Sequence, residues 1–221
     1  MPVSPELTGA LKKVVLTLED DLRARVTSQP EVDTAWRGLH AQAVDRERTA
    51  MSWQAWRDDR VTQAAVAWVL TSVFVRFCED NRLLGPVWIA GPGQRRQEAL
   101  DAELQYFRQN PEHTDREWLL QSVEHLAALR ATRDLVGTHS PLWTVSPSGQ
   151  AVKSLLSFWR ETRDDGSLVW DFTDPTLSTR FLGDLYQDLS DYAKKTFALL
   201  QTPEFVEEFI LDQTMEPALA E

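Results

Sequence analysis

The residue types that most often bind metals or act as nucleophiles are sparse and widely spaced in this sequence. The four histidines, His40, His113, His125 and His139, show no His-x-x-x-His spacing, and the single cysteine, Cys78, has no Cys-x-x-Cys partner. Zinc sites need such clustered ligands. The sequence also contains no Gly-x-Ser-x-Gly elbow and no Gly-x-x-x-x-Gly-Lys phosphate loop. It therefore predicts neither a metal centre nor a catalytic residue set of these kinds.

A metal-dependent nuclease of the restriction type is also disfavoured. Such an enzyme places an acidic residue two positions before a lysine, so that the carboxylate holds a metal beside the amine. The residues two positions before the five lysines are alanine, leucine or tyrosine. The Gly91-Pro92-Gly93 segment before Arg95 and Arg96 is better explained as a turn and a helix start than as a phosphate site.

Two of the nine tryptophans lie beside two arginines in a pattern that resembles a nucleic-acid surface. These residues are Trp53, Trp56, Arg57 and Arg60. Aromatic rings can stack on bases while guanidinium groups contact phosphates. Tryptophans also pack between helices, and this second interpretation is the favoured one. The four residues are therefore candidate DNA contacts, with interhelical packing as the stronger alternative.

The elements that would position these residues are helices. Apolar residues recur at intervals of three or four through most of the sequence, and prolines and glycines divide it into segments. We expect helices at 7–26, 31–48, 57–84, 95–108, 114–136, 151–162, 178–197 and 203–213. A short strand at 167–172 is the one plausible β element. The predicted fold class is all-α, an irregular multi-helix bundle.

The composition is that of a folded domain with unevenly placed charge. Of the 221 residues, 43% are hydrophobic and 26% are charged, and the formal net charge is −11. Residues 184–221 contain nine acidic and two basic residues, which gives this segment a net charge of −7. A chain this acidic is not expected to bind DNA unaided, because phosphate contacts need concentrated lysine and arginine.

The sequence predicts a cytoplasmic protein without a membrane role. One cysteine cannot form an internal disulfide, which fits a reducing compartment. The first residues lack the basic and apolar stretches of a signal peptide. The longest apolar run, 64–75, is shorter than the roughly 20 residues that a membrane span needs. We therefore expect this run in a buried core helix.

The segment around residues 201–210 has the features of a helix start. Thr202 suits an N-cap, Pro203 suits the first helical position, and the glutamates that follow complement the positive end of the helix dipole. Phe205, Val206 and the apolar residues one turn later would form a buried stripe. This pattern predicts a helix and is shared by many unrelated proteins.

Three motifs, covering about thirty residues, together resemble one protein family. Leu182-Gly183-Asp184-Leu185-Tyr186 and Thr202-Pro203-Glu204-Phe205-Val206 resemble the paired Leu-Gly-x-x-Tyr and Thr-Pro-x-x-Val signature of gamma-class adenine-N6 DNA methyltransferases. Phe77-Cys78-Glu79-Asp80-Asn81-Arg82-Leu83-Leu84 is similar to the Phe-Cys-Glu-Asp-x-Gly-Leu-Leu helix of their large phage-defence members. The chain looks most like the N-terminal region of the PglX-type enzymes of phage growth limitation and BREX systems. It departs from them at Asn81-Arg82, where Arg-Gly or Thr-Gly is usual.

The resemblance implies adenine methylation with S-adenosylmethionine by the full-length protein. In the family the Thr-Pro helix start lies against this cofactor, so Gln201, Thr202 and Pro203 would have that role here. The family's Asn-Pro-Pro-Tyr motif, which holds the flipped adenine, and its Gly-rich cofactor loop do not occur in this sequence. Asp174-Pro175-Thr176 predicts a turn before a helix rather than that loop. The chain by itself is therefore expected to be inactive and to bind no cofactor tightly.

We expect a helical N-terminal domain at 1–180 and, at 181–221, lead-in helices to a methyltransferase core that this chain does not contain. Its expected partners are the rest of the methyltransferase, double-stranded DNA in the full-length context, and other defence-system proteins. The alternative is a free-standing acidic helical adaptor of a defence system, acting through protein–protein contacts. A Gly-rich loop and an Asn-Pro-Pro-Tyr motif encoded beyond Glu221 would favour the first interpretation.

Overall fold

The computed structural model describes residues 4–189, which form seven α-helices and one 3-10 turn. The helices are α1 (Pro5–Ser28), α2 (Pro30–Asp45), α3 (Trp53–Asp80), α4 (Gln94–Gln109), α5 (Asp115–Ala128), α6 (Gly149–Trp159) and α7 (Arg180–Leu189), and the turn is η1 (Pro141–Trp143). No strand occurs in this range. The short strand considered at 167–172 is absent, and an isolated antiparallel bridge joins Leu168 to Thr162. The predicted all-α class is confirmed.

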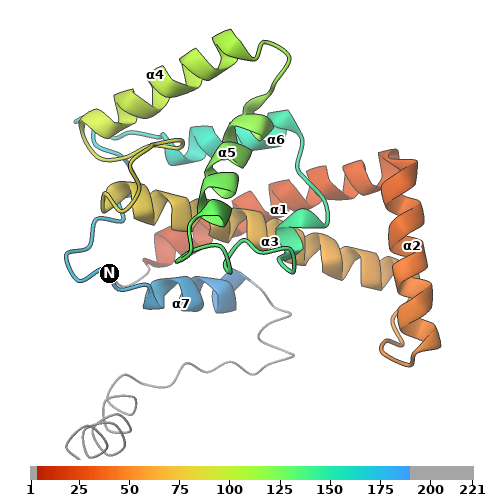
Figure 1. Cartoon of the computed structure of the whole chain (residues 1–221). Helices are drawn as coiled ribbons and strands as arrows, with labels where there is room; N and C mark the ends of the chain where they lie inside the picture. The colour runs from red at the N-terminus through yellow and green to blue at the C-terminus, as the bar shows by residue number, and fades with distance from the viewer. Residues whose placement is uncertain (1–3, 190–221) are drawn as a thin grey trace, which may run out of the picture.

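Two long helices, α1 and α3, lie side by side and form the axis of the bundle (Figure 1). α1 buries one stripe, which consists of Leu7, Leu11, Val15, Leu18, Leu22 and Val26. α3 buries 15 of its 28 residues, as suits a helix at the centre of a bundle. Its length and composition would also allow a membrane span, yet 67% of its most apolar window is buried inside the protein.

The remaining helices cover this axis on several sides. α7 packs on both α1 and α3, α5 packs on α6, and η1 packs on α3. α2 stands across one end of α1 and α3, and α4 lies on the outside of the bundle (Figure 1). α2 buries only Trp36 and α4 buries only Ala99. These two helices are therefore attached to the body rather than part of its core.

Side chains at the helix starts satisfy the free backbone N–H groups there. The hydroxyls of Ser4, Ser52 and Ser148 accept from the N–H groups three residues later and begin α1, α3 and α6. Thr114 and Glu117 form a capping box at the start of α5. The backbone N–H of Ser148 also donates to Asp21 of α1 at 2.8 Å, which fixes the start of α6 against α1.

The structure differs from the sequence prediction most clearly after α5. The apolar period predicts a helix over 114–136, whereas α5 ends at Ala128 and Leu129 has extended backbone angles. The Thr132 hydroxyl donates to the carbonyl of Leu126 at 2.7 Å and so satisfies one carbonyl of the last turn. Val136 returns to the core from a loop, with 3% of its surface exposed. Val136 continues the apolar spacing of the helix in the sequence, but it is buried by the packing of a loop and not as part of a helix.

Two sequence predictions extend beyond the described residues. The helix expected at 178–197 is described as α7 only up to Leu189, and the helix expected at 203–213 lies outside the described residues. The proposed division between 1–180 and 181–221 stays a prediction. Within the described part, Phe181, Leu185 and Leu189 of α7 belong to the same hydrophobic core as α1 and α3.

Candidate functional site

The C-terminal end of α3 contains a group of buried charged side chains. Arg76 and Glu79 have no exposed surface, and Asp80 is 4% exposed. Charged residues are rarely buried unless they are paired or hydrogen-bonded, because leaving water is costly for an ion. The hydrogen-bond partners of these three side chains therefore identify the segments of the chain that they fix to the end of α3.

Glu79 binds the loop that follows α3. Its carboxylate accepts hydrogen bonds from the backbone N–H groups of Trp88, Ile89 and Ala90 at 2.6, 3.0 and 3.0 Å. Burial raises the pKa of Glu79 above its ordinary value, while these three donors and Arg76 oppose the increase. The carboxylate replaces water as the acceptor for three consecutive backbone groups and fixes their direction.

Asp80 binds a segment that lies far away in sequence. One carboxylate oxygen accepts from the Arg76 guanidinium at 2.9 Å and from the backbone N–H of Phe172 at 2.8 Å. Arg76 also donates to the carbonyl of Trp170 at 3.0 Å. Burial raises the pKa of Asp80 to about 7, against the opposing effects of Arg76 and the Phe172 N–H. The Arg76–Asp80 ion pair thus attaches residues 170–172 to the end of α3.

Asn81 extends the same attachment by one residue. Its amide nitrogen donates to the carbonyls of Phe77 and Phe172 at 2.9 and 2.8 Å, and its amide oxygen accepts from the N–H of Asp174 at 2.8 Å. A side-chain amide is the group that can pair with a backbone N–H and a backbone C=O at once. We call Arg76, Glu79, Asp80 and Asn81 the α3 clamp.

Arg82, directly after the clamp, has a left-handed backbone with φ of 57°. The N–H of Arg82 bonds to the carbonyl of Glu79, and the N–H of Leu83 bonds to that of Cys78. This is the hydrogen-bond pattern of a Schellman helix end, whose left-handed residue is usually glycine. It gives a physical reason for the glycine that similar sequences have here, and it shows that arginine takes this conformation at a cost.

Aromatic side chains connect the end of α3 and residue 172 to the start of α7. The ring of Phe172 stacks on Phe181 with centroids 5.7 Å apart, and Phe77 contacts Phe181 at 5.4 Å. Phe77 belongs to the motif at the end of α3, and Phe181 directly precedes the Leu182–Tyr186 motif of α7. Two of the three motifs that carried the family resemblance therefore lie against each other in the fold.

The turn before α7 has the form that the sequence predicts and does not fit a cofactor loop. The Asp174 carboxylate accepts from the backbone N–H and the hydroxyl of Thr176 at 3.0 and 2.8 Å. A bond to Thr176 is one of the causes that lower the pKa of Asp174. One oxygen, Oδ1, makes both of these bonds within the turn, and Leu177 follows with φ of 52°. The residues proposed to lie against S-adenosylmethionine, Gln201, Thr202 and Pro203, lie outside the described residues.

The tryptophan and arginine group at the start of α3 lies between helices. Trp56 is 6% exposed, its ring is 6.0 Å from that of Trp53 and 6.3 Å from that of Trp36 of α2. The Arg60 guanidinium lies 4.1 Å from the centre of the Trp56 ring. Arg57 pairs with Asp58 at 2.8 Å. The rings therefore join α2 to α3, as the favoured interpretation had it, and DNA contact by these residues stays a prediction.

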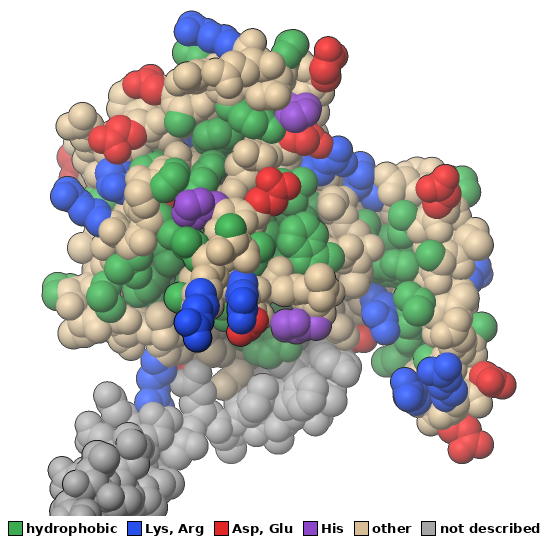
Figure 2. All heavy atoms as spheres, in the orientation of Figure 1, with side chains coloured by type: hydrophobic (Ala, Val, Ile, Leu, Met, Phe, Trp, Pro, Cys, Tyr) green, Lys and Arg blue, Asp and Glu red, His purple; other side chains and the backbone are tan. Residues whose placement is uncertain are grey.

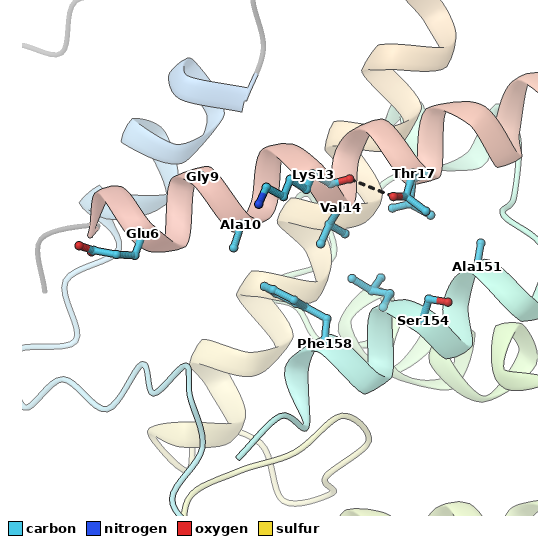
Figure 3. A pocket seen from close by; sticks show the side chains of 11 residues that line it. Glu6, Gly9, Ala10, Lys13, Val14, Thr17, Ala151, Ser154 and Phe158 are labelled. Carbon is cyan, nitrogen blue, oxygen red and sulfur yellow. Dashed lines mark hydrogen bonds between the residues drawn. The ribbon is translucent and has the colours of Figure 1, made fainter. Parts of the chain in front are cut away.

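A groove between α1 and α6 has a volume of about 480 Å³ (Figure 3). Gly9, Ala10 and Val14 line it from α1, and Ser154 and Phe158 line it from α6. The hydroxyl of Thr17 at its wall is bonded to the carbonyl of Lys13 at 3.0 Å. The lining is mostly apolar; Glu6 and Lys13 also line the groove, and the hydroxyl of Ser154 donates to the carbonyl of Gln150.

The described residues show no other arrangement suited to catalysis. No group of three or more His, Cys, Asp or Glu side chains in residues 4–189 could hold a metal ion. Burial raises the pKa of the Cys78 thiol to about 12, so this thiol is protonated and unreactive at neutral pH. The clamp is thus a positioning site. Sequence reasoning missed Arg76 and Asn81, although a charged pair four residues apart in an apolar helix was a readable signal.

Comparison with known proteins agrees with the motifs. The chain is 46% identical, over an alignment of 224 positions that covers 97% of its residues, to the adenine-specific methyltransferase PglX of Streptomyces coelicolor. The chain is similar to part of a PglX methyltransferase. It spans 18% of the length of that protein. No family model matches the chain, and no solved structure matches it.

The identity to PglX extends far beyond the motifs. Three motifs cover about thirty residues, whereas the aligned region covers 97% of the chain. The predicted resemblance to a PglX-type methyltransferase is therefore confirmed for nearly the whole chain. The clamp and its contact with α7 provide a structural reason why two of the motifs occur in one domain.

Proposed function

We propose that this chain is the helical N-terminal domain of a phage-defence adenine-N6 DNA methyltransferase that uses S-adenosylmethionine. The similarity to PglX supports this assignment. In this proposal the domain supports the catalytic core, contacts DNA or partner proteins in the cytoplasm, and has no methyltransferase activity by itself.

The observation that carries the proposal is the route from the α3 clamp to α7. Asp80 and Asn81 hold the backbone of residues 172–174, and Phe172 and Phe77 hold Phe181 at the start of α7. A chain that leaves α7 starts from a position fixed by buried hydrogen bonds. In our proposal this fixed departure point sets where the next segment, with Gln201, Thr202 and Pro203, meets the cofactor.

The geometry of the clamp suits support rather than chemistry. Each carboxylate of the clamp is buried and accepts from backbone N–H groups or from Arg76, so neither is exposed to a substrate in solution. The chemistry of methyl transfer would come from the core, with the cofactor bound there. The domain would contribute by ordering one edge of that site, because misplacement by about 1 Å can cost ~100-fold in rate.

The test compares the chain alone with a protein extended through the core. We expect isothermal titration of S-adenosylmethionine to give weak or no binding to this chain and tight binding to the extended protein. Tritiated methyl transfer to DNA should occur only with the extended protein. Tight cofactor binding by the isolated chain would contradict the proposal.

A clamp variant makes the test specific to the domain's supporting role. Asn81→Ala in the extended protein removes the bonds to Phe172 and Asp174 and should lower methyl transfer about 10- to 100-fold. Leu39→Ala, at an exposed site on α2, is the matched control and should leave the rate unchanged. Equal rates for both variants would show that the clamp does not position the core. Circular dichroism of both variants verifies that the helices are intact.

A further inference from the structure

The loop between α5 and α6, residues 129–148, is long and well anchored. Val136, Leu142 and Val145 are buried in the core at 3%, 0% and 5% exposure. The indole N–H of Trp68 in α3 donates to the carbonyl of Val145 at 3.2 Å. Loops longer than about 12–15 residues without regular structure are usually functional or disordered. This loop is instead fixed to the bundle, which holds its outer face in a defined position.

The outer face of this loop presents cationic and apolar side chains to solvent. Arg130, Arg133 and His139 are exposed, and Leu135 and Trp143 are 57% and 41% exposed. In the space-filling view, Lys, Arg and His side chains gather over the loop that follows α5 (Figure 2). Large apolar side chains are also exposed elsewhere on the described residues, so the cationic side chains are what distinguish this face.

The positive charge on this face is available to a partner. Arg133 lies 3.7 Å from Asp134, but these side chains are 61% and 91% exposed, so water screens the pair. Arg130 has no ion-pair partner among the described residues. Residues 125–159 contain Arg130, Arg133 and Lys153 against the single acid Asp134, although the whole chain has a net charge of −11. This segment is therefore locally basic in an acidic protein.

The loop lies beside the helix that leads toward the expected core. Leu135 and Val136 line a small pocket of about 160 Å³ together with Phe74 of α3 and Leu182 of α7. Leu182 is the first residue of the α7 motif. The loop that carries the basic residues therefore lies beside α7, the last described helix.

We propose that Arg130, Arg133, His139 and Trp143 form a contact surface for the phosphate backbone of double-stranded DNA. This inference rests on the proposed function, which supplies DNA as the substrate class. Guanidinium groups bind phosphate oxygens through paired N–H donors, and an exposed indole offers a flat surface to the sugar. The surface would position the duplex without reading its sequence.

The experiment measures binding of the 221-residue chain to a fluorescent duplex of mixed sequence by anisotropy, from about 20 to 200 mM salt. We expect weak binding that is measurable only at the lowest salt, because the net charge of −11 opposes unaided DNA binding at physiological salt. Arg130→Ala/Arg133→Ala should raise the Kd at least about tenfold and reduce the slope of log K against log salt by about 1.8, at about 0.9 per phosphate contact. Arg46→Ala/Arg48→Ala is the matched control. It removes the same charge from exposed residues after α2, at the far end of the bundle, and should change the Kd less than about twofold.

Each remaining outcome overturns the proposal. Equal weakening by both double variants would show that binding depends on overall charge rather than on this loop. Absence of wild-type binding at the lowest salt would show that the surface does not bind DNA. An acidic protein partner is the competing explanation, and it would appear as loss of poly-glutamate binding in Arg130→Ala/Arg133→Ala with duplex binding unchanged. The cofactor and methyl-transfer tests of the domain's function use other readouts, so either proposal can fail while the other stands.

Discussion

Arg82 occupies a backbone conformation that favours glycine, at the point where α3 ends. Its φ of 57° and the two hydrogen bonds of the helix end place it at the left-handed position of a Schellman motif. A side chain with a Cβ atom is strained there, whereas glycine is not. The two residues at which this sequence departs from the family pattern, Asn81 and Arg82, thus have opposite effects on stability. Asn81 makes three hydrogen bonds, and Arg82 introduces strain.

Arg82→Gly should therefore stabilise the domain. We expect the free energy of unfolding in urea to increase by about 1 kcal/mol, because the strain of a left-handed non-glycine residue is removed. Arg108→Gly is the control, since Arg108 lies in the ordinary helical backbone of α4 and its replacement should cost about 1 kcal/mol. Destabilisation by both substitutions would contradict the assignment of strain to Arg82.

The clamp should make stability depend on pH through Asp80. Its pKa is about 7 in the folded protein against an ordinary 3.8, because burial disfavours the charged form. The folded state therefore holds the proton more tightly than the unfolded state. The contribution of Asp80 to the free energy of unfolding is fully present below pH ~4 and is lost as the pH rises through about 7.

Asp80→Asn should remove this contribution. Urea unfolding of wild type between pH 4 and 8 should show a stability decrease to which Asp80 adds up to ~1.4 kcal/mol per pH unit, and the variant should lack that part. Burial also raises the pKa of Glu79, so some slope of the same sign remains in the variant. Asp134→Asn, whose side chain is 91% exposed, is the control and should keep the wild-type slope. Identical slopes for wild type and Asp80→Asn would refute the assignment.

At the scale of elements, α7 has two roles. Phe181, Leu185 and Leu189 fill the space between α1 and α3, so α7 completes the core. The same helix carries the Leu182–Tyr186 motif toward whatever follows. We infer that the folded unit extends at least to Leu189, and the division at 180 and 181 stays a prediction.

Two truncations test this placement of the domain end. A chain ending at Leu189 should unfold with the same cooperativity as the 221-residue chain, because the described core is complete. A chain ending at Thr179 loses three buried side chains, each worth about 1.5–3 kcal/mol, and should be less stable by several kcal/mol or unfolded. Thermal unfolding followed by circular dichroism distinguishes the two. Equal stability of the two truncated chains would place the domain end before α7.

At the scale of the whole molecule, charge and architecture divide the chain into regions. The segment 184–221 has a net charge of −7, counted from nine acidic and two basic residues, while the α5–α6 loop is locally basic. In the proposed methyltransferase, the acidic segment would be compensated by the core and the basic loop would face DNA. The chain spans 18% of its PglX relative, so both assignments concern a larger assembly.

The sequence by itself determined the fold class, most helix positions and the similarity to PglX. Helical periodicity and the proline and glycine breaks are local features, so they are readable without tertiary contacts. The motifs at 77–84 and 182–186 identified the PglX-type relationship that 46% identity confirms. The packing of Trp56 between helices was also predictable, because apolar rings near a helix start usually face the core.

The tertiary structure alone decided what the motifs do. Asp80 and Phe172 are 92 residues apart, and no local pattern indicates that they share a hydrogen bond. The end of α5 at Ala128 was mispredicted for a related reason, since Val136 is buried through loop packing that imitates a helical period. Buried charges depend on partners supplied by distant segments. The contacts of the α3 clamp therefore depend on the tertiary structure, which brings residues 88–90, residues 170–174 and α7 to the end of α3.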